Sequence, residues 1–306
     1  MRRRYMDAIT LVQRFEKPDI FLIMTCNPSW LEIEENLLSS DELQNRPDLV
    51  SPVFRAKLEE LKNDILKKHV FGKVAAFMYT AEFQKRGLPH AHFLIILDEN
   101  YKLLTPEAYD QFVCAELPDE KTNPYLYSLV TQHMMHGSCG SFNPTNSCMK
   151  KKGYCKHKYS KEFIEKTTKG KNSYLIYRRR NNGKNVKIRG HFLDNTWVVP
   201  YNPVLLCRFN SHMNVEICSD IKVVKYIYKY TCKGHDKIAF HIHFSDTNIE
   251  IDEIKEYQSA RWVSPPESAW RIFAFPISEM MYIIFNYILK GNNSFLSKVQ
   301  IILKKL

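Results

Sequence analysis

The amino-acid sequence predicts an α+β fold organised around a largely antiparallel β-sheet. The first observation is a strongly amphipathic helical segment at 51–70, in which apolar residues recur every three or four positions. The second is a pair of strand-like apolar runs, 74–84 and 90–97, joined by the turn-forming stretch 85–89 as a β-hairpin. Further strand-like segments follow in the second half of the chain, so strands and helices are mixed.

Prolines mark the ends of the predicted helix and strand that precede this hairpin. Residues 5–16 have helical spacing, and Pro18 ends the predicted helix. The apolar run 19–26, DIFLIMTC, is typical of a buried strand and stops at an Asn-Pro dipeptide. In the long helix that follows, Ser51 is the expected N-cap and Pro52 suits the first turn.

The second half of the chain contains four more segments that we expect to be strands. They are NSYLIYRRR (172–180), NVKIRGHFLD (185–194), VLLCRF (204–209) and HMNVEIC (212–218). In the last of them, His212, Asn214 and Glu216 share one face because side chains alternate along a strand. They could support a metal site or simply be satisfied at a sheet edge.

Composition narrows the class of protein. Of 306 residues, 44 are Lys or Arg and 33 are Asp or Glu, which gives a net charge of +11. This excess favours a polyanionic partner, most often nucleic acid, although a basic soluble protein without such a partner has the same charge. The apolar run 280–289 is too short to span a bilayer, so we expect an intracellular protein without a membrane partner. Eight cysteines are too few for a secreted disulfide scaffold, and three of them cluster as in metal sites.

The stretch KVVKYIYKYTCKG, 222–234, is predicted to be a helix with two chemically distinct faces. At about 100° per residue, Tyr226 and Tyr230 fall on one side and Tyr228 on the apolar side. The lysines that share the first side are Lys222, Lys229 and Lys233. As a strand, lysines and apolar residues would share both faces, which favours the helix. Taken alone, two outward tyrosines beside a solvated row of lysines are more often ordinary surface residues.

A histidine pair supplies a candidate metal site. His90 and His92 are two positions apart on a predicted strand, so both imidazoles point the same way. On the paired strand, Glu82 and Gln84 also share a face. Two imidazoles and one oxygen ligand leave open positions, which suits Mg²⁺ or Mn²⁺ acting as a Lewis acid on phosphate. A second His-x-His, at 241–243, has no acidic or amide residue on a paired strand, and we interpret it as structural.

Together the two features favour phosphodiester chemistry. A tyrosine phenol is a poor nucleophile near neutral pH. It can attack a phosphodiester when a metal polarises the phosphate and lysines stabilise the developing charge. The predicted product is a 5′-phosphotyrosine link with a free 3′-OH, and two tyrosines would allow two successive strand transfers.

The Cys/His-rich stretch at 131–160 predicts a zinc-binding insert. The expected ligands follow an H-x2-C-x8-C-x6-C spacing, and they are His136, Cys139, Cys148 and Cys155. His133 and His157 are further candidates, and free loop cysteines are the alternative. Two basic runs, Lys150–Lys152 and Arg178–Arg180 (Arg178, Arg179 and Arg180), are candidates for tracking a DNA backbone, with a solvated loop as the alternative.

The chain resembles the replication-initiator-like nuclease domain of Helitron transposases, the "Helitron helicase-like domain" family of the HUH endonuclease superfamily. The resemblance covers about residues 5–275. The motifs that carry it are YMDAITLVQRFEKPDIFLIMTCNPSW, RPDLVSPVFRAKL, EFQKRGLPHAHFLIIL, MMHGSCG with CMKKKGYC, YNPVLLCRFNSHMNVEIC, VVKYIYKYTCKGHD and ARWVSPPESAWRIFAF. QKRGLPHAH together with KYxxKYxxKG is highly specific to the family.

The resemblance implies an HUH-type central antiparallel sheet flanked by helices. It places the metal-binding histidines on His90 and His92 and the nucleophilic pair on Tyr226 and Tyr230. Glu82 is the first choice for the third ligand and Gln84 the second. It implies four units, namely the first part of the nuclease domain at 1–130, the zinc insert at 131–160, the second part of the nuclease domain at 161–275, and a divergent tail at 276–306.

The function that the resemblance implies is nicking and rejoining of single-stranded DNA during rolling-circle transposition, in the nucleus. Complete Helitron proteins continue into a helicase, but no G-x-x-x-x-G-K-[ST] phosphate loop occurs here, so this sequence gives no sign of ATPase activity. We therefore expect a truncated or domesticated copy, for which a separate helicase is a candidate partner. The alternative is a catalytically inactive, zinc-containing, DNA-binding remnant.

Overall fold

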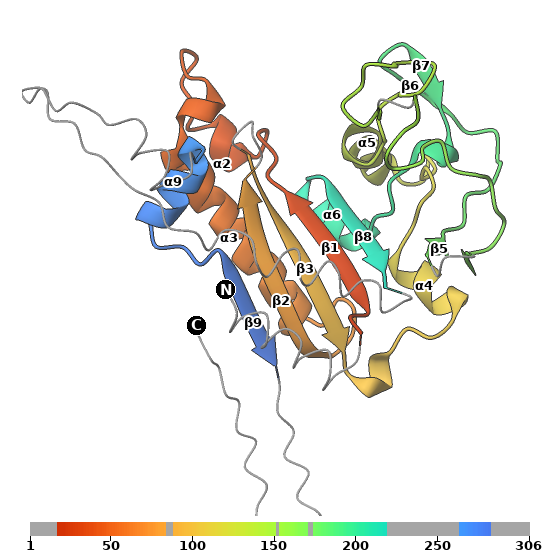
Figure 1. The fold of residues 1–306 in the computed structure, drawn as a ribbon, viewed down its shortest axis with the longest axis horizontal. Helices are drawn as coiled ribbons and strands as arrows, with labels where there is room; N and C mark the ends of the chain where they lie inside the picture. Colours follow the sequence, from red (N-terminus) through yellow and green to blue (C-terminus); the bar gives the residue numbers. More distant parts are fainter. Residues whose placement is uncertain (1–16, 84–87, 151–152, 171–173, 219–262, 283–306) are drawn as a thin grey trace, which may run out of the picture.

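The computed structural model describes residues 17–83, 88–150, 153–170, 174–218 and 263–282. Its centre is a five-stranded sheet in the order β8-β1-β3-β2-β9, in which every neighbouring pair is antiparallel (Figure 1). The strands are β1 Ile20–Thr25, β2 Val74–Phe83, β3 Pro89–Leu97, β8 Met213–Ile217 and β9 Ser278–Tyr282. The expected α+β class with an antiparallel sheet is confirmed.

The predicted hairpin is formed by β2 and β3. Its register places Glu82 opposite His90 and Thr80 opposite His92. The apolar residues of both strands are buried on both faces of the sheet, as expected for a central hairpin. The hairpin is therefore held rigidly in the middle of the molecule.

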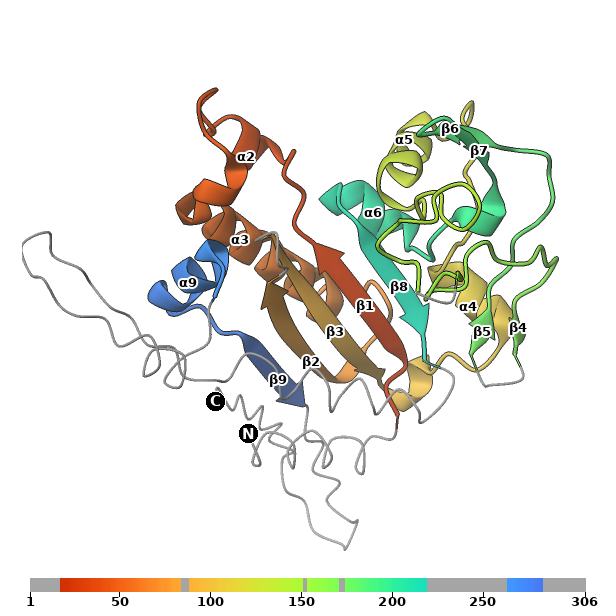
Figure 2. The ribbon, with the colours of Figure 1, turned by 45° about the horizontal axis from the view of Figure 1, so that its top comes forward.

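One face of the sheet is covered by helices, and the main one is α3 Pro47–Leu66 (Figures 1 and 2). Its apolar side packs against the sheet through fully or nearly fully buried residues, among them Phe54, Leu58 and Leu61. The shorter helices on this side are α2 Leu31–Glu34 and α9 Pro265–Ile272, whose Trp270 is completely buried. Three turns of 3₁₀ helix, Leu43–Asn45, Glu99–Tyr101 and Asn195–Trp197, connect other elements.

The start of α3 differs from the prediction. The helix begins at Pro47, and its N-cap position is Arg46 rather than Ser51. Ser51 lies inside the helix, is fully buried, and donates a 3.0 Å hydrogen bond to the carbonyl of Pro266 in α9. The prediction of Ser51 as N-cap was wrong because Pro47, four residues before Ser51, fills the first turn as well as Pro52 would.

A second lobe lies beside β8, one of the two edge strands of the described sheet (Figure 2). It contains the helices α4 Pro106–Phe112, α5 Pro124–His133 and α6 Pro203–Phe209. It also contains two short hairpins, β4 Thr168–Lys169 with β5 Leu175–Ile176, and β6 Val186–Ile188 with β7 His191–Leu193. The lobe has apolar clusters of its own, separate from the core beneath the sheet.

The segment VLLCRF was predicted to be a strand and is wrong, because it forms α6. The Oδ1 atom of Asn202 accepts a 2.9 Å hydrogen bond from the backbone N–H of Leu205, and Pro203 occupies the first turn. A side-chain cap followed by proline is a strong helix start, and it overrides the β propensity of Val204.

Several predicted features fall outside the described residues. They are the helix at 5–16, the helix at 222–234, the second His-x-His at 241–243 and most of the tail at 276–306. Within the described ranges, no helix is both long enough and apolar enough to cross a membrane.

Candidate functional site

Two groups of side chains in the described ranges have the composition and spacing of metal ligands. The first comes from the β2–β3 hairpin and joins Glu82, His90 and His92. One ligand atom from each lies within 4.8 Å of the other two. The Oε2 atom of Glu82 is 3.2 Å from Nε2 of His90 and 3.5 Å from Nε2 of His92.

The sheet register explains why these three side chains meet. His90 and His92 are two positions apart on β3, and Glu82 lies directly across from His90 on β2. Residues opposite one another on neighbouring antiparallel strands point to the same face. The two imidazoles are 4.8 Å apart between ring centroids, and the ring of Phe21 on β1 stacks on His92 at 5.8 Å. The hairpin and this packing fix the ring positions without help from a loop.

The donor set fits a hard or borderline divalent cation. Neighbouring ligands of an octahedral ion with bonds of about 2.1 Å lie about 3 Å apart, close to the Glu82–histidine distances. Three protein ligands leave open coordination positions for substrate. The side chains are 7–15% exposed, so the cluster is shielded from bulk water without being sealed. Gln84, the second choice for the third ligand, lies outside the described residues.

Three polar residues around β8 do not join this cluster. In the register of the sheet, Ile23 of β1 stands between Asn214 and His92, so the amide is separated from the imidazole by a whole strand. Asn214 donates instead to Glu216, at 3.1 Å. Nδ1 of His212 lies 2.7 Å from the carbonyl oxygen of His133, and burial lowers the pKa of His212. His212 is therefore engaged with His133, and Asn214 with Glu216, rather than with the Glu82 cluster.

The second group of ligands lies in the other lobe. One donor atom from each of its four members lies within 4.8 Å of the others, and the members are His136, Cys139, Cys148 and Cys155. Nε2 of His136 is 3.5 Å from Sγ of Cys155. In a tetrahedral zinc site with bonds of about 2.0–2.3 Å, donor atoms are about 3.5–4 Å apart, so this set fits a closed zinc site.

The local fold brings these ligands together around a small core. A tight hairpin carries Cys148 and Cys155, with a β-bridge between Met149 and Cys155. The three cysteines pack with Leu193 and Trp197. Both of these residues lie outside the expected insert at 131–160. The ring of Tyr159 stacks on His136 at 4.1 Å between centroids. Burial, with the nearby His157, lowers the pKa of His136 to about 4, so its ring is neutral and offers a lone pair.

The two further histidine candidates are not part of this cluster. Nε2 of His133 lies 2.8 Å from Oδ1 of Asn210 and is therefore engaged elsewhere. His157 is close, with its ring centroid 5.8 Å from that of His136, but it is not among the four converging ligands.

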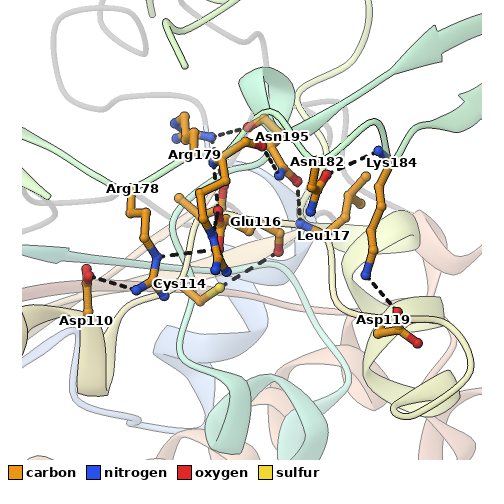
Figure 3. Close-up of polar contacts among 12 residues, drawn as sticks. Asp110, Cys114, Glu116, Leu117, Asp119, Arg178, Arg179, Asn182, Lys184 and Asn195 are labelled. Carbon is orange, nitrogen blue, oxygen red and sulfur yellow. Dashed lines mark hydrogen bonds and ion pairs between the residues drawn. The ribbon is translucent and has the colours of Figure 1, made fainter. Parts of the chain in front are cut away.

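The prediction that Arg179 tracks a DNA backbone was wrong. Arg179 is 2% exposed, and its guanidinium donates to the carbonyls of Ala115, Asn195 and Val198 at 2.6–3.1 Å. Figure 3 shows this side chain reaching toward Asn195. A guanidinium enclosed by carbonyl oxygens cannot reach a phosphate in solution.

Arg178 and Arg180 are paired with carboxylates. Arg180 makes a bidentate pair with Glu116, at 2.6 and 2.9 Å, and Arg178 lies 3.3 Å from Asp110 and 3.5 Å from Glu116. Figure 3 shows Arg178 between these two acidic residues. Their role in DNA binding remains a prediction, weakened by this pairing.

Glu116 is a structural residue that sequence reasoning missed. It is 5% exposed and accepts hydrogen bonds from both the backbone and the side chain of Arg180. The signal for Glu116 in the sequence is the run of three consecutive arginines, because such a run needs nearby carboxylates when it folds against the protein. The remaining predicted residues, Tyr226, Tyr230, Lys229, Lys222 and Lys233, lie outside the described residues.

Comparison with known proteins agrees with the resemblance. The family model described as "Helitron helicase-like domain at N-terminus" matches residues 1–95, a segment that contains β1 and the complete Glu82, His90 and His92 cluster. A search of curated proteins finds no match. The family match supports a transposon-related function. The match covers residues 1–95 of the 306, and over this segment the chain is similar to the Helitron helicase-like family.

Proposed function

We propose that the protein is a metal-dependent single-strand DNA endonuclease and strand transferase of a rolling-circle transposon. The observation that carries the proposal is the convergence of Glu82, His90 and His92 on a rigid hairpin, inside the segment that matches the family. The antiparallel sheet with helices on one face is compatible with an HUH-type fold.

The proposed reaction uses a tyrosine of the chain as nucleophile. When bound, a divalent ion such as Mg²⁺ or Mn²⁺ supplies polarisation of a phosphodiester oxygen. The phenol oxygen of Tyr226 or Tyr230 forms a bond to phosphorus, the bond from phosphorus to the 3′ oxygen breaks, and the phenol proton passes through solvent to that oxygen. Lys229, with Lys222 and Lys233, stabilises the developing charge. The 5′-phosphotyrosine link keeps the bond energy, so a second 3′-OH can reverse the step.

A structural Zn²⁺ completes the proposal. His136 and the three cysteines hold it, and it stabilises a segment whose own apolar core is small. Four protein ligands leave no open position, so this ion takes no part in the chemistry. A separate helicase, as a partner in the nucleus, would supply the unwound strand.

The direct test is covalent trapping. The full chain is incubated with labelled single-stranded DNA and Mn²⁺, and a protein–DNA adduct that survives denaturation is expected. Replacing both Tyr226→Phe and Tyr230→Phe should abolish the adduct. Tyr228→Phe is the matched control, because the predicted helix places Tyr228 on the opposite face. Absence of any adduct with the wild-type protein would reject the proposal, and an adduct in the double variant would reject the assignment of the tyrosines.

The second candidate function is DNA binding without cleavage. The observation that favours it is the Cys/His cluster in a strongly basic part of the chain, which needs no catalytic residue. It predicts zinc-dependent retention of DNA by the wild-type protein with no adduct under any divalent cation. The trapping experiment therefore separates the two functions.

A further inference from the structure

The positive charge of the protein is concentrated in one segment. Residues 136–193 contain 15 Lys or Arg and 2 Asp or Glu, so this segment carries +13 and the rest of the chain carries −2. The segment begins at the zinc-type ligand His136 and ends in β7. Because a nucleic acid backbone is the commonest partner for such charge density, this segment rather than the whole protein is the candidate polyanion-binding surface.

The arginines at 178–180 contribute less to that surface than their sequence suggests, because Arg179 is buried and Arg178 and Arg180 are paired with carboxylates. Seven basic residues in the segment are exposed and have no acidic partner within the described ranges, and they are Lys150, Lys156, Lys158, Lys166, Lys169, Lys187 and Arg189. These side chains are free to approach phosphates.

The β6–β7 hairpin presents one of these lysines beside an exposed aromatic ring. Lys187 and Phe192 are directly opposite in the register, so their side chains share one face. On the other face, Leu193 is fully buried against the Cys/His cluster. The inward face therefore anchors the hairpin, while Phe192 remains 67% exposed on the outward face.

The hairpin that carries Cys148 and Cys155 repeats the arrangement. Nζ of Lys150 lies 5.2 Å from the ring centroid of Tyr154, and Tyr154 is 48% exposed. The two cysteines of this hairpin are buried in the same small core as Leu193. Each hairpin thus combines an inward anchor on the Cys/His core with an outward pair of one aromatic ring and one lysine.

We propose that these two hairpins form a binding surface for single-stranded nucleic acid, with bases stacked on Phe192 and Tyr154 and phosphates held by Lys187 and Lys150. Exposed rings favour a single strand because the bases of a duplex are already stacked on one another. The surface is separate from the Glu82 cluster, since β6 and β7 lie in the second lobe, beyond the edge strand β8 (Figure 2). The inference deepens the proposed function, on which it rests for the identity of the strand.

The test is equilibrium binding of a fluorescent oligothymidylate to the zinc-loaded full chain, without added Mg²⁺ or Mn²⁺. Phe192→Ala and Tyr154→Ala should each weaken binding by about fivefold to a hundredfold, the usual range for loss of one stacked base. Lys187→Gln should reduce the slope of log affinity against log salt by about 0.7. Affinity for a duplex of the same length should change much less in the two aromatic variants.

The controls separate binding from folding. Phe192→Leu keeps an apolar side chain without a ring, and it should lose affinity while zinc content and thermal midpoint stay at the wild-type values. Ile272→Ala removes an equally exposed apolar residue, 69% exposed, from α9 in the other lobe, and it should bind normally. Wild-type affinity in Phe192→Ala and Tyr154→Ala together would overturn the inference, and so would an equal loss for the duplex.

The result is independent of the trapping experiment. Ring-dependent binding by a protein that forms no adduct would support the surface and reject the nuclease. An adduct formed by a protein whose binding ignores both rings would do the reverse.

Discussion

The two ligand clusters differ in what holds them in place. Glu82, His90 and His92 project from neighbouring strands in the centre of a sheet whose backbone pairing is complete without an ion. The four ligands of the Cys/His cluster come from loops and a tight hairpin, and their three cysteines are themselves most of the local core. The sheet organises the first cluster, whereas the second cluster must organise its own lobe.

This difference indicates opposite roles for the two proposed ions. Three ligands on a rigid hairpin leave coordination positions for substrate, and the fold does not depend on the ion. Four ligands close the coordination sphere, and the binding energy goes into folding. Removing each ion in turn is therefore the most direct way to test the comparison.

The largest effect is expected for loss of the Cys/His cluster. Cys148→Ser should abolish zinc binding and unfold the segment 136–193, because structural zinc contributes about 10–16 kcal/mol in small zinc domains. Limited proteolysis followed by mass spectrometry should then show new cleavages in this segment, with the five-stranded sheet still protected. His157→Ala, which removes a neighbouring histidine outside the cluster, should keep both zinc and protection. Full zinc occupancy in Cys148→Ser would contradict the assignment.

The next largest effect concerns the buried guanidinium of Arg179. Arg179 ties Ala115 to Asn195 and Val198, so Arg179→Ala should remove three buried hydrogen bonds and lower the free energy of unfolding by about 3 kcal/mol. Urea unfolding followed by circular dichroism measures this change. Arg189→Ala, at an exposed turn, should change stability by less than about 0.5 kcal/mol. Equal stability of the two variants would mean that Arg179 is not a structural link.

A third effect concerns the sheet cluster and should separate binding from stability. His90→Ala should weaken Mn²⁺ binding by at least about a hundredfold, equivalent to about 2.7 kcal/mol, while the thermal midpoint stays near that of the wild type. Titration followed by electron paramagnetic resonance of free Mn²⁺ measures the affinity. Glu216→Gln, a carboxylate on β8 in the same sheet, is the control and should bind normally. Collapse of the fold in His90→Ala would place this cluster in the same class as the Cys/His cluster.

The sequence predicts the sheet cluster well because all of its geometry is local. A turn-forming stretch between two apolar runs fixes a hairpin, and the hairpin register then sets Glu82 opposite His90. The prediction of a strand at VLLCRF was wrong, although the sequence contains a helix signal there. That signal is the N-cap Asn202 followed by Pro203 in the first turn. In this segment the capped start outweighs the β propensity of Val204.

The basic segment shows what local reasoning cannot supply. Three consecutive arginines look like exposed charge, and burial of Arg179 depends on carbonyls from Ala115 and Val198, which only the tertiary fold brings near. Lys187 and Phe192 look like an ordinary strand pair until the fold shows that their opposite face is anchored in the Cys/His core. Alternation along a strand predicts two faces but not which face meets solvent.

The smallest effect is a pH dependence at the buried carboxylate of Glu116. Burial opposes ionisation of Glu116, but hydrogen bonds and charges from Arg180, with the charge of Arg178, outweigh it and hold the pKa of Glu116 below its ordinary value. A carboxylate whose pKa is lower in the folded protein stabilises the fold above its ordinary pKa, and this contribution disappears as the pH falls through the folded value. Glu116→Gln should therefore cost roughly 1 kcal/mol of stability near neutral pH and little in acid. Urea midpoints of wild type and variant, measured from about pH 7 down to about pH 3, should converge as the pH falls. Parallel curves would show that the charge of Glu116 contributes nothing to the stability of the fold.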